Sequence, residues 1–190
     1  METQVYQAIL ERRPAQIIAR LKEILATPNP ALGGELRFFL GWAQEVGGEH
    51  AAAQESWRQA RNELEPFLKE QPDNYLLIGD MALTSMALGD KAAALALAQK
   101  ATAARPLEKD AIDGSYALEL LARVLAQAGE PDRAITAIQK LLSIPSSGSF
   151  AVGIPLTPAV LRLDPMFDPL RNDPRFQKLV ASPGSKDEKK

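Results

Sequence analysis

The residues whose chemistry could support catalysis or metal binding are few in this chain. It contains one histidine, His50, and no cysteine. A single imidazole needs carboxylate partners to form a proton relay or a metal site, and no acid stands at a suitable spacing. The lack of cysteine removes disulfides, thiolate catalysis and sulfur-ligated metals. We therefore interpret His50 as a surface residue.

Two groups of acidic residues are the remaining candidates. Asp110, Asp113 and Glu119 could be imagined as an acid cluster, but linker and helix-cap roles explain them better. The other group consists of three aspartates that each precede a proline, namely Asp164, Asp168 and Asp173. Aspartate followed by proline is typical of a helix start, which gives each of them a capping role instead of a metal.

Nucleotide binding is not indicated either, because the glycine pairs at 33–34 and 47–48 lack the spacing and the preceding strand of a phosphate-binding loop. With no catalytic group in view, we predict a protein that is not an enzyme and that needs no cofactor or metal. Its net charge of -2 argues against nucleic acid and against an anionic membrane surface as partners.

Composition and length indicate one soluble domain, with 46% hydrophobic residues in 190. The uncharged stretch 141–161 is long enough to span a bilayer, but its prolines and glycines exclude a continuous helix. We interpret it as a loop. The amino-terminal residues lack the features of a secretory signal, and we expect a cytoplasmic location.

The elements that must position any site repeat along the chain. Glycine followed by an acid occurs at Gly48-Glu49, Gly89-Asp90 and Gly129-Glu130, at intervals of about 40 residues. Each pair follows a helical apolar pattern and precedes an alanine-rich one. Glycine ends a helix in the left-handed conformation, and an acid suits the start of the next. The pattern predicts three helical hairpins.

The middle hairpin is the clearest, with helices predicted over 74–88 and 91–104. One apolar stripe lies on the first helix, and an alanine face on the second allows close packing. These residues are Ile78, Met81, Ala82, Ser85, Ala94, Ala98 and Ala101, and Pro106 follows them as a stop. The third hairpin repeats the layout with Leu118, Leu121, Ala122, Leu125, Ala134, Ile138 and Leu141, and the first with Leu40, Gly41, Ala53, Trp57 and Ala60.

In these residues the chain resembles the tetratricopeptide repeat, over about residues 35–145. The first copy departs from the pattern, because Arg37 and Gln44 occupy apolar positions, and the repeats exceed the usual length of about 34 residues. The resemblance implies a right-handed superhelical array of helix hairpins. It also implies a concave groove for a protein or peptide partner, and hence an interaction or scaffolding module.

The two ends of the chain complete the predicted organisation. Residues 1–30 form a helix pair, either a degenerate repeat or a cap; the repeats cover 31–73, 74–106 and 107–145; a loop covers 146–156, a helical C-terminal cap 157–182 and a disordered tail 183–190. The stretch around DPLRNDPRF resembles a signature that follows tetratricopeptide arrays in large bacterial kinases and winged-helix regulators. This resemblance implies the alternative function, a regulatory or self-associating segment of a larger bacterial signalling protein.

Helical phase selects the side chains that would line the groove. The first helices of the three hairpins present eight candidates for partner contact: Phe38, Trp42, Leu76, Leu83, Met86, Tyr116, Glu119 and Arg123. Aromatic, methionine and arginine side chains are common interface anchors. Packing against a neighbouring helix or against the C-terminal segment is the alternative role for these residues.

Overall fold

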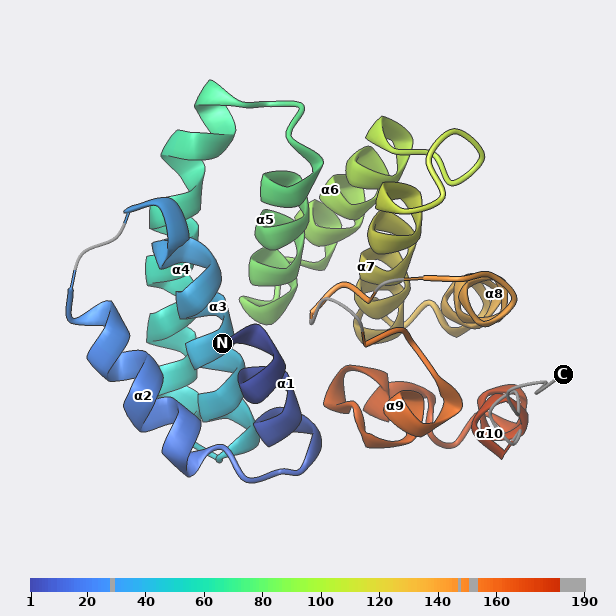
Figure 1. The fold of residues 1–190 in the computed structure, drawn as a ribbon, viewed down its shortest axis with the longest axis horizontal. Coiled ribbons are helices and arrows are strands. Elements are labelled where there is room, and N and C mark those ends of the chain that lie inside the picture. Colours follow the sequence, from blue (N-terminus) through green and yellow to red (C-terminus); the bar gives the residue numbers. More distant parts are fainter. Residues whose placement is uncertain (28–29, 147, 151–153, 182–190) are drawn as a thin grey trace, which may run out of the picture.

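The computed structural model describes residues 1–27, 30–146, 148–150 and 154–181. All regular structure in these ranges is helical, and they contain no strand (Figure 1). The expected all-α class is therefore confirmed. In chain order the helices are α1 (Glu2–Leu10), α2 (Ala15–Leu25), α3 (Pro30–Val46), α4 (His50–Glu70), α5 (Tyr75–Ala87), α6 (Lys91–Ala104), α7 (Asp113–Ala128), α8 (Pro131–Leu142), α9 (Pro158–Leu163), the 3-10 helix η1 (Pro165–Leu170) and α10 (Pro174–Ala181).

Six of these helices form three consecutive pairs. Within the pairs α3 packs on α4, α5 on α6 and α7 on α8; between them α4 contacts α5 and α6 contacts α7. The first members also contact one another, α3 with α5 and α5 with α7. The first helices therefore form one continuous wall, and Figure 1 shows α1 beside this wall, between α3 and the C-terminal segment.

The turns inside the pairs have the predicted conformation. Gly48, Gly89 and Gly129 have φ angles of 79°, 87° and 88°, in the left-handed region that glycine adopts without strain. In each turn the following acid donates its backbone N–H to a carbonyl five residues earlier, at 2.8, 2.9 and 3.0 Å. This bond satisfies a carbonyl at the helix end and folds the chain back on itself.

Small side chains set the distance between paired helices. Ala94, Ala98 and Ala101 of α6 are at most 1% exposed, which confirms the predicted alanine face. In the first pair Gly41 has the same role, because a Cβ atom there would lie 2.4 Å from Nε1 of Trp57. The two polar departures in α3 are also accounted for. Gln44 accepts a hydrogen bond from the Ser56 hydroxyl at 2.7 Å, and Arg37 pairs with Glu63 of α4.

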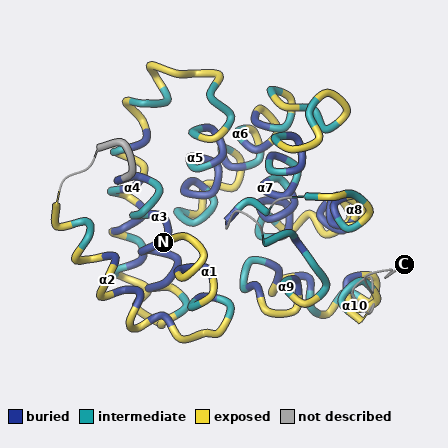
Figure 2. The backbone as a smooth tube through the Cα atoms, viewed as in Figure 1, coloured by how far each residue is buried: buried dark blue, intermediate teal, exposed yellow. Residues whose placement is uncertain are grey.

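The buried side chains form two clusters. Figure 2 shows that the buried backbone positions lie on the facing sides of the helices. One cluster lies among α1 to α7, includes Phe150 and is rich in aromatic residues. The other joins α7 and α8 to the C-terminal segment, where Leu161, Phe167, Leu170 and Phe176 are at most 2% exposed. The C-terminal residues therefore belong to the core of the molecule.

One sequence-based interpretation needs correction. Asp168 does not cap a helix: it lies inside η1 and pairs with Arg12 and Arg171. Asp164 and Asp173 do accept backbone N–H groups, from Met166 and Arg175. The predicted disordered tail 183–190 lies outside the described residues, and no helix within the described ranges is long and apolar enough to cross a membrane.

Candidate functional site

Five of the eight predicted groove residues lie inside the protein. Phe38, Trp42, Leu83, Glu119 and Arg123 are between 1% and 5% exposed. Their side chains do face the inner wall, as helical phase predicted, but α1 and the C-terminal segment cover that wall. The chain's own ends thus occupy part of the wall at which a partner was expected.

The polar part of this covered wall is a buried network around Arg123 of α7. Its guanidinium pairs with Glu119 at 2.6 Å and with the carboxylate of Asp164, at the start of η1. Tyr6 of α1 donates its hydroxyl hydrogen to Asp164 at 2.6 Å and accepts one from Arg123 at 3.1 Å. Phe150 and Phe167 lie over the guanidinium, with ring centroids at 4.4 and 5.0 Å from Cζ. The side chain of Arg123 therefore contacts α1, α7 and the C-terminal segment at once.

The electrostatics of the network follow from its burial. Burial alone would lower the pKa of Arg123, but the charges of Asp164 and Glu119 and the Tyr6 hydroxyl raise the pKa well above its usual value. Burial raises the pKa of Tyr6, and the neighbouring Asp164 adds to that increase. Arg123 therefore stays charged and Tyr6 stays protonated across the physiological range, so this group is a fixed structural element and not a proton-transfer site.

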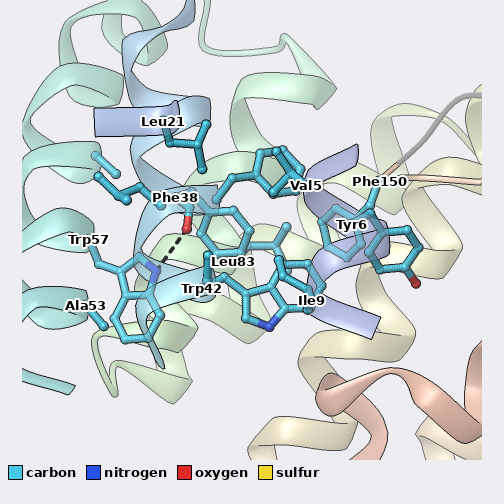
Figure 3. Packing of buried hydrophobic residues seen from close by; sticks show 14 of the residues in the cluster. Val5, Tyr6, Ile9, Leu21, Phe38, Trp42, Ala53, Trp57, Leu83 and Phe150 are labelled. Carbon is cyan, nitrogen blue, oxygen red and sulfur yellow. Dashed lines mark hydrogen bonds between the residues drawn. The ribbon is translucent and has the colours of Figure 1, made fainter. Parts of the chain in front are cut away.

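The apolar part of the wall is an aromatic cluster, shown in Figure 3. Trp42 is surrounded by Tyr6, Phe38, Phe39 and Phe150, with ring centroids 4.9 to 6.4 Å away. Such contacts stabilise a core beyond the burial of area alone. Trp42 is thus a core residue, and truncation to alanine is expected to destabilise the fold by about 3–5 kcal/mol.

Part of the inner wall remains open as a cleft of about 500 Å³. Its lining comes from the first helices of all three pairs, from α4 and from η1, and we call it the inner-wall cleft. The lining residues are Arg12, Trp42, Glu45, Val46, Trp57, Leu83, Met86, Ala87, Arg123, Val124, Gln127, Pro165, Met166, Asp168 and Pro169. Four predicted groove residues, Trp42, Leu83, Met86 and Arg123, are among them.

An ion pair crosses one side of the inner-wall cleft. Arg12, in the turn between α1 and α2, donates to both carboxylate oxygens of Asp168 at 3.2 and 3.0 Å. Arg12 has a φ angle of 56° and is the one described non-glycine residue in the left-handed region. The turn also has the backbone bond of the glycine turns, from Arg13 N–H to the Ala8 carbonyl at 2.9 Å. Arg12 thus combines a left-handed backbone conformation with a side chain that lines the cleft.

The other predicted groove residues lie elsewhere. Leu76 and Tyr116 line a separate cleft at the start of α5, Phe38 belongs to the aromatic cluster and Glu119 to the Arg123 network. The inner-wall cleft is also lined by Arg12, Met166 and Asp168. The sequence did not predict a role for these three residues in a binding site. The large apolar content of residues 157–182 did indicate that this segment packs against the helices. It did not show which helices the segment contacts.

The inner-wall cleft has a largely apolar lining. Tryptophan, leucine, valine and methionine side chains line it together with the charged groups of Arg12, Glu45, Arg123 and Asp168. Among the described residues no three His, Cys, Asp or Glu side chains are grouped so that they could hold a metal ion. His50 is largely exposed and contacts Glu45 at 3.0 Å. No family model matches the chain, and neither a curated protein nor a solved structure shows significant similarity to it.

Proposed function

We propose that the protein is a non-catalytic interaction module, built from tetratricopeptide-like helix hairpins, that binds a segment of a partner protein at the inner-wall cleft. The repeated glycine turns, the alanine face of α6 and the continuous wall of α3, α5 and α7 support the hairpin array. The turn at Arg12 has the same backbone bond as the glycine turns, which favours a degenerate repeat for α1 and α2.

The cleft itself is the observation that carries the proposal. Its volume of about 500 Å³ is typical of binding pockets, and it is open to solvent although the rest of the wall is covered. Trp57 and Met86 offer polarizable apolar surface, which suits an inserted aliphatic or aromatic side chain. Arg12, Asp168 and Glu45 in the lining can hydrogen-bond to the backbone or to polar side chains of the same segment.

The experiment uses the tryptophans as reporters, because both tryptophans of the chain line the cleft. Peptides selected from a displayed random library on the intact protein are titrated while tryptophan fluorescence is recorded. Ala87→Arg, which fills the cleft from α5, should weaken binding at least tenfold. Ala92→Arg on the exposed side of α6 is the matched control and should bind normally. Peptides that bind both variants equally, with no fluorescence change, would exclude the cleft as the binding site.

A further inference from the structure

A second cleft, of about 340 Å³, gathers carboxylates from four helices. Glu2 comes from α1, Glu35 from α3, Asp80 from α5 and Asp113 from α7. We call the first three the carboxylate cluster. The remaining lining residues are Tyr75, Leu76, Ile112, Tyr116, Gly148 and Ser149, while α4 and α6, which also pack on α5, contribute none.

No side-chain cation lines the cleft beside the carboxylate cluster. No lysine, arginine or histidine lines the cleft, and Glu2, Glu35 and Asp80 form no hydrogen bond or ion pair with any described residue. The fourth acid, Asp113, does have a cation, because its carboxylate lies 3.6 Å from Nε of Arg105. Arg105 also stacks on Tyr75, at 5.0 Å from the ring centroid, on the α7 side of the cleft. The repulsion among the three cluster acids is therefore not offset by a side-chain cation in the lining of the cleft.

The protonation of the cluster reflects this arrangement. Burial raises the pKa of Asp80 to about 8, and the charges of Glu35 and Glu2 contribute to the increase. Burial also raises the pKa of Glu35, again with a contribution from Glu2. Tyr116 faces the same acids, and burial followed by the charges of Asp80, Glu35 and Glu119 raises the pKa of its hydroxyl. At neutral pH Asp80 is accordingly mostly protonated.

The position of α1 couples it to this cluster. Helix α1 has nine residues, and Glu2 is its one charged side chain. It is held by Val5, Tyr6 and Ile9, each at most 1% exposed, which point into the aromatic cluster in Figure 3. A helix this short is not stable alone in water, so α1 keeps its structure only while it is docked. Undocking would remove Glu2 from the carboxylate cluster and open one wall of the cleft to water.

We propose that docking of α1 is pH-sensitive: the helix stays docked while the carboxylate cluster holds a proton, and it opens more readily once the cluster is fully ionised. The sign follows from linkage. Opening of α1 would admit water to the cleft and remove the charge of Glu2, and both changes would lower the pKa of Asp80. The stabilisation is therefore complete at low pH. It is lost as pH rises toward about 8, the pKa of Asp80 in the docked state.

Hydrogen exchange of the full chain tests this proposal. Protection of the α1 amides, corrected for intrinsic exchange rates, is measured from pH 6 to about pH 9 and divided by the protection of α4. We expect the ratio to fall at least tenfold, because a pKa difference of about one unit between the two states already has that effect. In the Asp80→Asn variant the ratio of α1 to α4 protection should stay constant over this pH range. A constant ratio in the wild-type chain would overturn the proposal.

Variants of Glu2 keep the test decisive if Asp80→Asn does not fold, because Glu2 is exposed at the end of α1. Glu2→Gln should reduce the fall in α1 protection, and Glu2→Lys, which places a cation at the cluster, should increase protection at high pH. The control is Glu65→Gln, at an exposed position of α4, which should behave like the wild type. Equal pH profiles in Glu2→Lys and the wild type would also overturn the proposal.

Discussion

At the residue scale, the role of Arg123 depends on partners that are distant in the sequence. Helical phase correctly placed its side chain on the inner wall, where we expected partner contact. Glu119 lies one turn away on the same helix, but Asp164 is 41 residues downstream and Tyr6 is 117 residues upstream. Its 1% exposure follows from where these two segments pack. The residue's direction was therefore predictable, while its neighbours were not.

The Arg123 network leads to a prediction about stability. Arg123→Met keeps much of the side chain's volume but leaves Asp164 and Glu119 buried without a cation, and should lower the free energy of unfolding by about 3–5 kcal/mol. Urea denaturation measures the change. The control is Arg58→Met, whose ion pair with Glu55 lies on the surface, and we expect little change there. A loss in Arg123→Met as small as that in the control would mean that the buried ion pairs contribute little to stability.

At the scale of elements, local sequence determined most of what is observed. Glycine at the turns, alanine on α6 and Asn74 or Asp90 at helix starts act within a few residues, so their effects are readable without the fold. Asn74 accepts from Leu76 N–H at 3.1 Å and Asp90 from Ala93 N–H at 3.1 Å. The role of Asp168 was not predictable in this way, because its contacts with Arg12 and Arg171 come from the packing of η1.

The alanine face gives an element-scale prediction. Ala94→Leu should overpack the α5–α6 hairpin and lower stability by about 1–3 kcal/mol, because Ala94 is 0% exposed. Ala96→Leu, two residues along the same helix at an exposed position, is the matched control and should melt like the wild type. Differential scanning calorimetry compares the two. An unchanged melting temperature for Ala94→Leu would contradict the close α5–α6 packing.

At the scale of the molecule, the C-terminal segment (residues 154–181) links the helix hairpins to one another. Its Asp164 joins the network of α1 and α7, and its Phe167 packs in the cluster of α7 and α8 while lying over Arg123. The inner wall is consequently shared between internal packing and the remaining inner-wall cleft. Partner binding by the chain stays a prediction, now directed at the cleft instead of the whole wall.

This integration predicts cooperative unfolding. Phe167→Ala, in the C-terminal segment, should lower the free energy of unfolding by about 3–5 kcal/mol. It should shift the fluorescence transition of Trp42 and Trp57 in the first hairpin together with the circular dichroism transition. The control is Leu163→Ala, at a side chain that is 51% exposed, with little expected effect. A fluorescence transition that stays unchanged while the dichroism transition broadens would show that the C-terminal segment unfolds independently.

The amino-acid sequence by itself determined the helical class, the three hairpin turns, the small-residue contacts and the side of each first helix that faces inward. These depend on backbone conformation and helical periodicity, which act over a few residues. Tertiary structure alone decided what covers that side. The docking of α1 and of residues 154–181 depends on contacts between segments that are distant in the chain, 41 residues apart for Arg123 and Asp164 and 158 for Tyr6 and Asp164. Such contacts follow from shape and charge complementarity after the helices have packed, and leave no periodic pattern in the chain.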